Sequence, residues 1–332
     1  MTFPGHFPTT RLRRLRQKQW IRDLVAESSL TVHDLILPIF LRTPEMSPEI
    51  PSLPDVKRFT LEELPSLVET ISHVGIPAVA LFPVVSSSLK TDRGCEALNP
   101  DNLICQAIQG FKKYNPALGV ITDVALDPYT THGHDGLLNN QQIDNDATLD
   151  VLCQQALIQA QSGADAIAPS DMMDGRVGAI RTFLDQKGFC QTLILSYAAK
   201  YASSFYGPFR QAIDAAPLQG IIDKKTYQMN PANSREALRE VSQDLQEGAD
   251  MIIVKPGMPY LDVIHHVSHT FQIPTLAFQV SGEYAALIAA GQKGWINTDQ
   301  AMTESLLAFK RAGACAILTY WALKMAKHLL CK

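Results

Sequence analysis

Short runs of aliphatic and aromatic residues recur along the chain, and longer stretches with apolar residues at helical spacing separate them. Eight of these runs are expected to form strands, over residues 35–40, 78–83, 120–126, 166–170, 193–199, 251–255, 275–280 and 316–321. Helices are expected between them, for example over residues 61–74, 147–161, 233–247 and 298–312. Such alternation is typical of a parallel sheet covered by helices.

Glycine marks the end of several expected helices. Gly75, Gly163, Gly248 and Gly313 each stand just before a strand, at the position where a helix often ends with a left-handed residue. Eight strand–helix units in a chain of this length predict a (β/α)8 TIM barrel. A doubly wound sheet is the alternative, but no glycine-rich phosphate-binding motif follows the first strand.

A basic segment precedes the first strand, where residues 11–18 read RLRRLRQK. No hydrophobic signal core precedes it and no small-residue cleavage region follows it. We therefore favour an arm that docks on another subunit over a transit peptide or a frayed terminus. The expected organisation is an N-terminal arm over residues 1–32 and a barrel over residues 33–332.

Composition and charge exclude several classes of protein. Of the 332 residues, 46% are hydrophobic and 19% are charged, which is ordinary for a globular chain. A net charge of −4 argues against a nucleic-acid partner, and no apolar run is long enough to span a membrane. The six cysteines form no CxxC pair, which is typical of reduced thiols in a cytoplasmic protein.

Two lysines stand at the carboxyl ends of expected strands, where a barrel carries its chemistry. Lys200 follows the strand at 193–199, and Lys255 ends the strand at 251–255. Burial and a second nearby ammonium both lower the pKa of a lysine, and a neutral amine is a nucleophile toward ketones. The pair predicts Schiff-base catalysis on two carbonyl compounds, or on one with a cationic helper. A solvated or ion-paired lysine is the alternative at each position.

Other polar residues obey the same strand-end rule. They are Asp123, Asp127, Asp171, Ser281 and Tyr320. Two long connections, residues 130–146 and 201–231, are expected to form lids or binding segments because loops of this length are uncommon in a compact domain.

Seven segments resemble one enzyme family in sequence and in order. They are residues 122–136 (TDVALDPYTTHGHDG), 168–176 (APSDMMDGR), 196–200 (SYAAK), 205–210 (FYGPFR), 254–262 (VKPGMPYLD), 279–284 (QVSGEY) and 318–320 (LTY). Over nearly its whole length the chain resembles the porphobilinogen synthases, also called δ-aminolevulinic acid dehydratases. The resemblance implies a lyase that condenses two 5-aminolevulinate molecules to porphobilinogen, with loss of two waters, in tetrapyrrole (heme) biosynthesis. A class I aldolase with one catalytic lysine and a non-catalytic scaffold are the alternatives.

The resemblance also implies roles for individual residues. Lys255 corresponds to the lysine that forms a Schiff base with the substrate supplying the propionate arm, and Lys200 to the lysine that engages the second ketone. Hydroxyl anchors for the first substrate's carboxylate correspond to Ser281 and Tyr320. Anchors for the second carboxylate correspond to Arg210, Lys224 and Gln228.

One part of the family pattern differs in this chain. Zinc-dependent members place three cysteines where this chain has Ala125, Asp127 and Asp135. Zinc prefers thiolate and imidazole ligands, so the chain resembles the aspartate-type branch and no active-site zinc is expected. Asp127 and Asp135, with Asp123 nearby, are then expected to transfer protons or to hold the substrate amino group. His132 and His134 leave a zinc site as the alternative.

A second metal site is implied on the helix expected at 233–247. Glu240 matches the family's direct ligand for an allosteric, largely hydrated Mg²⁺, with Asp171 and Arg176 in its outer shell. Taken alone, Glu240 is typical of a surface glutamate. The resemblance further implies a homo-octamer and no organic cofactor.

Overall fold

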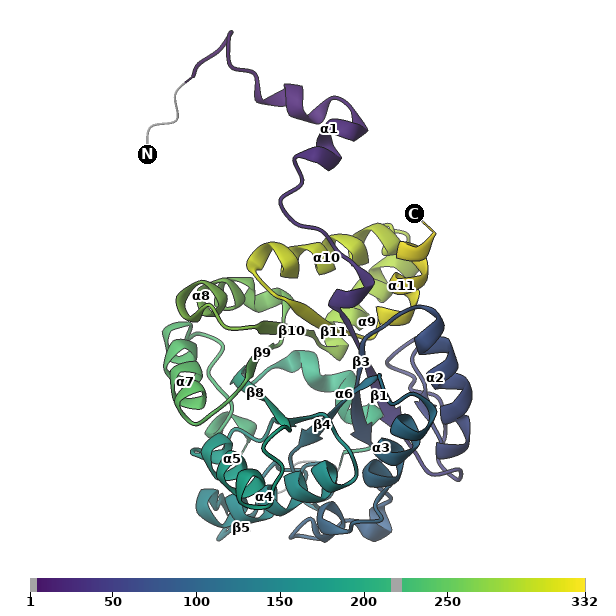
Figure 1. The fold of residues 1–332 in the computed structure, drawn as a ribbon, viewed down its shortest axis with the longest axis vertical. Coiled ribbons are helices and arrows are strands. Elements are labelled where there is room, and N and C mark those ends of the chain that lie inside the picture. Colours follow the sequence, from purple (N-terminus) through teal and green to yellow (C-terminus); the bar gives the residue numbers. More distant parts are fainter. Residues whose placement is uncertain (1–4, 216–222, 332) are drawn as a thin grey trace.

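All of the expected strands are present, and they pair side by side into a closed parallel ring (Figure 1). The computed structural model describes residues 5–215 and 223–331. The ring consists of β1 (Leu35–Leu41), β3 (Ala78–Pro83), β4 (Gly119–Val124), β7 (Ala166–Pro169), β8 (Leu193–Lys200), β9 (Met251–Lys255), β10 (Thr275–Gln279) and β11 (Ala316–Thr319). Pairing of β11 with β1 closes it, and the short strand β2 (Arg58–Phe59) is added beside β1. The (β/α)8 barrel is confirmed.

Helices surround this ring and connect its strands (Figure 1). They are α2 (Leu64–His73), α3 (Leu103–Tyr114), α4 (Asn145–Gln161), α5 (Arg176–Gln186), α6 (Gly207–Ala212), α7 (Arg235–Gln246), α8 (Leu261–Phe271), α9 (Ser281–Gln292), α10 (Thr298–Ala312) and α11 (Ala322–Leu330). The helix expected at 61–74 divides into a 3-10 turn and α2, because Pro65 lacks an N–H and is accommodated in the first helical turn. The four glycines expected at helix ends all have positive φ.

Large side chains fill the carboxyl-terminal half of the barrel. Phe40, Phe82 and Phe278 come from three different strands, and their ring centroids lie 6.0 to 6.2 Å apart in the pairs that contact. All residues of β1 are buried, because one face points into the barrel while the other packs against α3 and α11. The apolar runs of the sequence therefore reflect burial on both faces of each strand.

Strand β8 contains an irregularity that decides which way its last side chain faces. Ser196 pairs with Ile252 and the next registered pair is Ala199 with Val254, so β8 advances one residue more than β9. An extra residue of this kind inverts the alternation of side chains beyond it, since that alternation has a period of two. The bulge places Lys200 opposite Lys255, and both side chains lie on the same face of the sheet.

The two long connections carry local structure of their own. Residues 130–146 contain the hairpin of β5 (Leu138–Asn139) and β6 (Gln142–Ile143). Within 201–231, a 3-10 turn at Ser204–Tyr206 runs into α6. We call residues 204–212 the lid segment, because they lie over the site described below.

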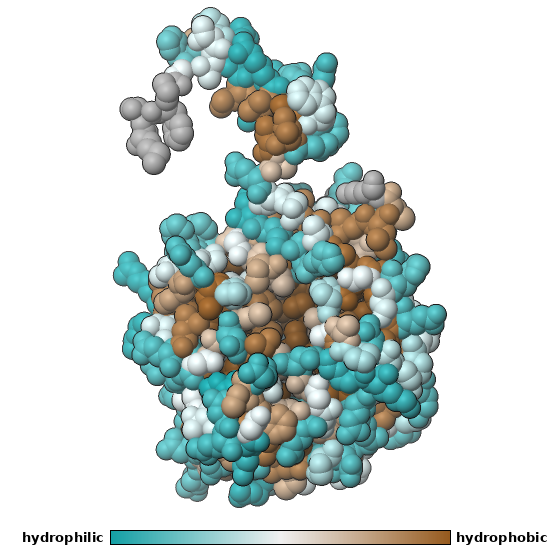
Figure 2. Space-filling model, in the orientation of Figure 1, coloured by the Kyte–Doolittle hydropathy of each residue, from teal (hydrophilic) through white to brown (hydrophobic). Residues whose placement is uncertain are grey.

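The amino-terminal residues project away from the barrel (Figure 1). They form a 3-10 helix at Leu12–Arg16 and the helix α1 (Gln19–Leu24), and neither contains a buried residue. Figure 2 shows apolar side chains gathered on this projection; those most exposed are Phe7, Leu12, Trp20 and Leu24. The division into an arm of residues 1–32 and a barrel of residues 33–332 stays a prediction. None of the helices in the described ranges could cross a membrane.

Removal of residues 1–19 is expected to leave a folded barrel and to shift assembly toward smaller species. Neither Leu12–Arg16 nor α1 contains a buried residue, so we expect a neighbouring subunit to cover the apolar side chains of these two segments. Far-ultraviolet circular dichroism checks the fold, and sedimentation velocity checks the assembly. An unchanged sedimentation profile would contradict a role for the arm in assembly.

Candidate active site

The two strand-end lysines face each other at the carboxyl end of the barrel. Lys200 ends β8, Lys255 ends β9, and the two are direct partners in the parallel ladder. Each is 5% exposed. The structure therefore brings two buried amines to one point, which is the arrangement expected from the sequence.

Aromatic rings surround the amine of Lys255. Its Nζ lies 4.7 Å from the ring centroid of Phe278, 4.9 Å from Tyr197, 5.1 Å from Phe209 and 5.6 Å from Tyr206. Across residues 5–215 and 223–331, no hydrogen bond or ion pair reaches this nitrogen. Burial lowers the pKa of Lys255 to about 7, and the charge of Lys200 acts in the same direction. A large fraction of Lys255 is therefore a neutral amine at neutral pH.

Lys200 has polar partners instead. Its Nζ lies 3.4 Å from Oδ1 of Asp135 and donates a hydrogen bond to the carbonyl oxygen of Ser170. The two lysines thus differ in chemistry although they are adjacent: one amine is enclosed by rings and the other is held by oxygen atoms.

A third buried lysine balances the carboxylates of the site. Lys224 Nζ lies 3.2 Å from Asp127 Oδ2 and 3.0 Å from Asp135 Oδ2. Burial alone would raise the pKa of Asp135, but the ammonium groups of Lys200 and Lys224 outweigh it and hold that pKa below its usual range. Burial would lower the pKa of Lys224, and the two carboxylates raise it instead. Asp135 and Lys224 are therefore charged together.

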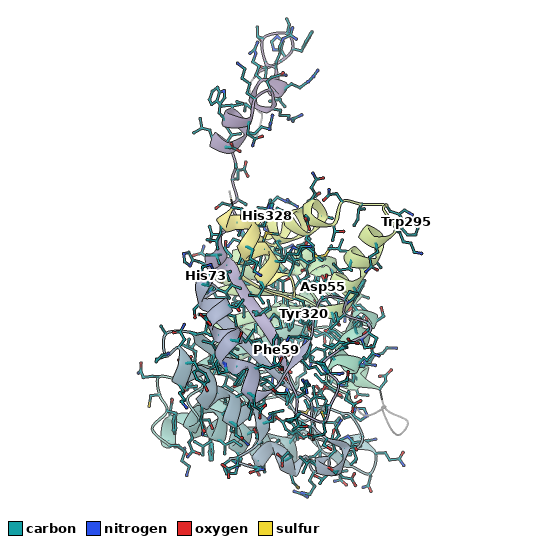
Figure 3. All side chains as sticks on the ribbon, turned by 90° about the vertical axis from the view of Figure 1, so that its right-hand side faces the viewer. Asp55, Phe59, His73, Trp295, Tyr320 and His328 are labelled. Atoms are coloured by element: carbon teal, nitrogen blue, oxygen red, sulfur yellow. The ribbon has the colours of Figure 1, made fainter. Side chains whose placement is uncertain are left out.

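The buried polar atoms without a hydrogen-bond partner among the described residues include Asp123 Oδ1, on β4, and the Tyr320 hydroxyl, just after β11. Burial raises the pKa of Asp123 to about 6, although Lys255 and Lys200 oppose it. The Tyr320 ring stacks on Phe40 with centroids 5.7 Å apart, and Figure 3 shows Tyr320 within the body of the barrel. An unpartnered buried hydroxyl of this kind suits a polar ligand.

The lid segment is seated directly on Ser281. The Ser281 hydroxyl accepts a hydrogen bond from the backbone N–H of Phe209 at 2.9 Å and donates one to the carbonyl of Phe205 at 3.3 Å. The buried guanidinium of Arg58 donates to the carbonyls of Gln211 and Ala212, both at 2.7 Å. Two separate contacts therefore hold the lid segment in place.

A small cavity of about 30 Å³ remains beneath the lid segment, which is enough for a water molecule or two. It is lined by Asp127, Lys200, Tyr206, Phe209, Arg210, Lys224, Gln228 and Lys255. The cavity thus brings the three expected anchors of the second substrate beside both lysines. Ser281 and Tyr320 lie outside its lining.

The residues expected to bind magnesium lie elsewhere. Glu240 is half-buried on α7 and, with Arg176, lines an open groove of about 640 Å³. Arg176 is buried below it, 3.1 Å from Asp244 and 3.8 Å from the fully buried Asp171. Burial raises the pKa of Asp171 to about 7 and also raises that of Glu240, while Arg176 opposes both shifts. Nearby Asp174 and Glu236 add to the negative charge at Glu240.

The segment where zinc-dependent relatives carry cysteines makes polar contacts of other kinds. His134 Nδ1 lies 3.1 Å from the Tyr227 hydroxyl, and His132 Nε2 lies 3.1 Å from the Asp92 carbonyl. Ala125 is buried. In the part of the chain that the structure describes, no three His, Cys, Asp or Glu side chains are arranged to hold a metal ion.

Known proteins match the chain over almost all of its length. The family model for delta-aminolevulinic acid dehydratase matches residues 9–328. The chain belongs to the delta-aminolevulinic acid dehydratase family. Enzymes of that name from Bradyrhizobium diazoefficiens and Rhodobacter capsulatus are 55% and 51% identical to it, over 96% and 97% of this chain and 90% and 97% of their own.

A solved structure of the family agrees with the fold. The delta-aminolevulinic acid dehydratase (porphobilinogen synthase) of Toxoplasma gondii, in complex with the reaction product porphobilinogen, superposes with a TM-score of 0.93 at 48% identity, covering 96% of this chain and 91% of that one. The chain is accordingly a lyase that condenses two 5-aminolevulinate molecules to porphobilinogen, with loss of two waters, in heme biosynthesis. The aldolase and scaffold alternatives are excluded.

Two features of this dehydratase site were not expected from the sequence. One is the aromatic enclosure of Lys255, to which Tyr197 contributes only because of the bulge in β8. The other is Glu283, a buried carboxylate beside the turn that follows Lys255. Glu283 lies in the segment 279–284 (QVSGEY), where the sequence predicts a role for Ser281 alone.

The rate of Schiff-base formation at Lys255 is expected to increase about tenfold per pH unit below about pH 7 and then to level off. Below the pKa of about 7 the amine is protonated and unreactive, and above it the neutral nucleophile predominates. The check is cyanoborohydride trapping with 5-aminolevulinate between about pH 5 and pH 9, with Lys255 peptides quantified by mass spectrometry. A rate that still increases steeply above about pH 8, as for an ordinary lysine, would contradict the enclosure argument.

Proposed function

We propose that Lys255 and Lys200 carry out the dehydratase reaction together, each as a Schiff-base or ketone-binding lysine for one of the two substrates. The observation that carries this proposal is the pairing of Lys255 with Lys200 across β8 and β9. Lys255 attacks the ketone of the substrate that supplies the propionate arm, because its amine has the lowered pKa. The resulting iminium acidifies the adjacent carbon, so that a carbon–carbon bond can form to the second substrate.

Lys200 engages the ketone of the second substrate. Asp135 lies 3.4 Å from its amine, so a carboxylate is within reach when protons leave that nitrogen. Asp123, with its raised pKa and an unpartnered oxygen, is the group best suited to accept and return a proton near neutral pH. Asp127 and Asp135 complete the set of catalytic carboxylates.

The carboxylates of the two substrates bind on opposite sides of the lysine pair. Ser281 and the Tyr320 hydroxyl hold the first, and the residues from the 201–231 connection, Arg210, Lys224 and Gln228, hold the second. The cavity of about 30 Å³ is too small for either substrate. The lid segment therefore moves outward on binding, and the Ser281 hydroxyl exchanges its contacts with Phe205 and Phe209 for the substrate carboxylate.

The chain belongs, in this proposal, to an aspartate-type branch without active-site zinc. The support is Lys224, whose ammonium lies within 3.2 Å of both Asp127 and Asp135. A cation supplied by the chain already balances the carboxylates that replace the zinc cysteines, and a divalent ion between them would face electrostatic repulsion. Ala125 offers no ligand atom.

Magnesium is the metal that suits the groove beside α7. Hard oxygen ligands and one or two carboxylates are sufficient for a hydrated Mg²⁺, and Glu240 with the acidic groups around it fits that donor set. Asp171 and Arg176, buried below, would orient the water shell. We further propose an allosteric role for this ion, a homo-octamer held by the exposed arm, and a cytoplasmic location.

Lys255→Ala is expected to lower porphobilinogen synthesis by about 10⁴-fold or more, because no other group can form the first iminium, and Lys200→Ala should be nearly as damaging. Lys225→Ala, which removes an exposed lysine next to Lys224, is the matched control and should retain activity. Colorimetric assay of porphobilinogen and circular dichroism of each variant provide the measurements. Appreciable activity in folded Lys255→Ala would refute the assignment of that lysine.

Chelator-treated protein is expected to respond to magnesium but not to require zinc, and Glu240→Ala should lose the magnesium response while keeping basal activity. Loss of the direct ligand weakens binding, and an ion that binds only the larger assembly stabilises it by mass action. Activity and sedimentation across a magnesium titration test this, with the exposed Glu304→Ala as the control. Restoration by zinc alone, or a wild-type magnesium response in Glu240→Ala, would contradict the metal assignment.

A further inference from the structure

Glu283 is a buried carboxylate that forms no ion pair with any residue in the described ranges. It lies in the first turn of α9 and is 3% exposed. Its side-chain oxygens accept three backbone N–H groups: those of Val280 at 2.6 Å, Gly257 at 3.2 Å, and Met258. Burial of a carboxylate is costly without such donors, so each of the three bonds contributes to keeping this group in place.

The three donors belong to the ends of two neighbouring strands. Gly257 and Met258 follow Lys255 at the end of β9, and Val280 follows β10 and directly precedes Ser281. One carboxylate thus joins the turn after the nucleophilic lysine to the turn that carries the hydroxyl anchor. The turn after Lys255 is also closely packed, since a Cβ at Gly257 would lie 2.6 Å from the Phe309 ring.

The backbone of Lys255 is held from its other side as well. Its carbonyl oxygen accepts hydrogen bonds from the backbone N–H of Tyr201 at 2.9 Å and from the Tyr206 hydroxyl at 3.2 Å. The bonds from Tyr201 and Tyr206 therefore fix Lys255 relative to the end of β8. Glu283 fixes the two residues of the following turn relative to β10. Tyr206 belongs to the lid segment, which also contacts Ser281, whereas Glu283 bonds directly to the two turns that follow Lys255 and precede Ser281.

We propose that Glu283 is a positioning residue that sets the spacing between the Lys255 amine and the Ser281 hydroxyl. The inference rests on the roles proposed for those two residues. In 5-aminolevulinate the carboxylate and the ketone are separated by two methylene groups. When Ser281 holds the carboxylate, the ketone reaches the Lys255 amine only if the distance between that amine and the Ser281 hydroxyl matches this length. Glu283 would then select 4-oxo acids over longer oxo acids.

A helix-capping role alone makes a different prediction. The bond from Val280 to Glu283 is half of an N-terminal capping box, and its loss would lower stability without changing which oxo acid reacts. Reaction rates are sensitive to misplacement of reacting groups by as little as about 1 Å. Discrimination between substrates of different length therefore distinguishes positioning from capping.

The test uses Glu283→Gln in the full chain, which keeps the side-chain size but turns an N–H₂ group toward backbone N–H groups. The probes are 4-oxopentanoate and 5-oxohexanoate, each trapped on the protein with cyanoborohydride, and label at Lys255 is quantified by peptide mass spectrometry. Wild-type protein is expected to label with the 4-oxo acid at least about tenfold faster, the discrimination that one methylene gives. Glu304→Gln, at an exposed position on α10, is the control and should match the wild type.

In Glu283→Gln, the rate with 4-oxopentanoate should fall about tenfold or more, and the preference over 5-oxohexanoate should shrink to about threefold or less. A lowered melting temperature with the preference unchanged would overturn the proposal and leave Glu283 as a helix cap. If Glu283→Gln does not fold, Glu283→Asp, which retracts both oxygens by one carbon, takes its place with the same expectation. Wild-type protein without label at Lys255 would instead refute the role of Lys255, and the inference with it.

Discussion

The site depends on the burial of one amine, that of Lys255, among aromatic rings and without an ion pair to any of the described carboxylates. Moving its pKa from the ordinary 10.5 to about 7 disfavours the ammonium form by on the order of 5 kcal/mol, because each pKa unit corresponds to about 1.4 kcal/mol. The fold carries this cost because the neutral amine is the reactive form. An ion pair at Lys255 would have stabilised the protein locally and removed the nucleophile.

The distribution of carboxylates around the site keeps that amine unpaired. Asp135 is held between Lys200 and Lys224, and Asp127 is held by Lys224, so neither is free to neutralise Lys255. Asp123 remains, and burial raises its pKa. Lys224 therefore has two effects in the proposed mechanism: it balances the aspartates that replace zinc ligands, and it leaves Lys255 without an ion-paired carboxylate among the described residues.

Much of this could be predicted from the sequence, because the signals were local. Apolar runs buried on both faces predicted the barrel strands, and strand-end position predicted that Lys200 and Lys255 would share one edge. The bulge in β8 could not be predicted, since it depends on the pairing of β8 with β9. The contacts of Glu283 could not be predicted either, because its three donors lie on two turns that are adjacent only in the folded barrel.

The central claim is that a large fraction of Lys255 is neutral at neutral pH in the protein without substrate. Trace acetylation with acetic anhydride across about pH 5 to pH 10 reports the protonation of each lysine. A free lysine derivative is the internal standard, and peptide mass spectrometry is the readout. The pH at the midpoint of each labelling curve, not the absolute labelling rate, gives the pKa. The account predicts a midpoint near pH 7 for Lys255. A midpoint near the ordinary lysine value of about 10.4 would contradict it.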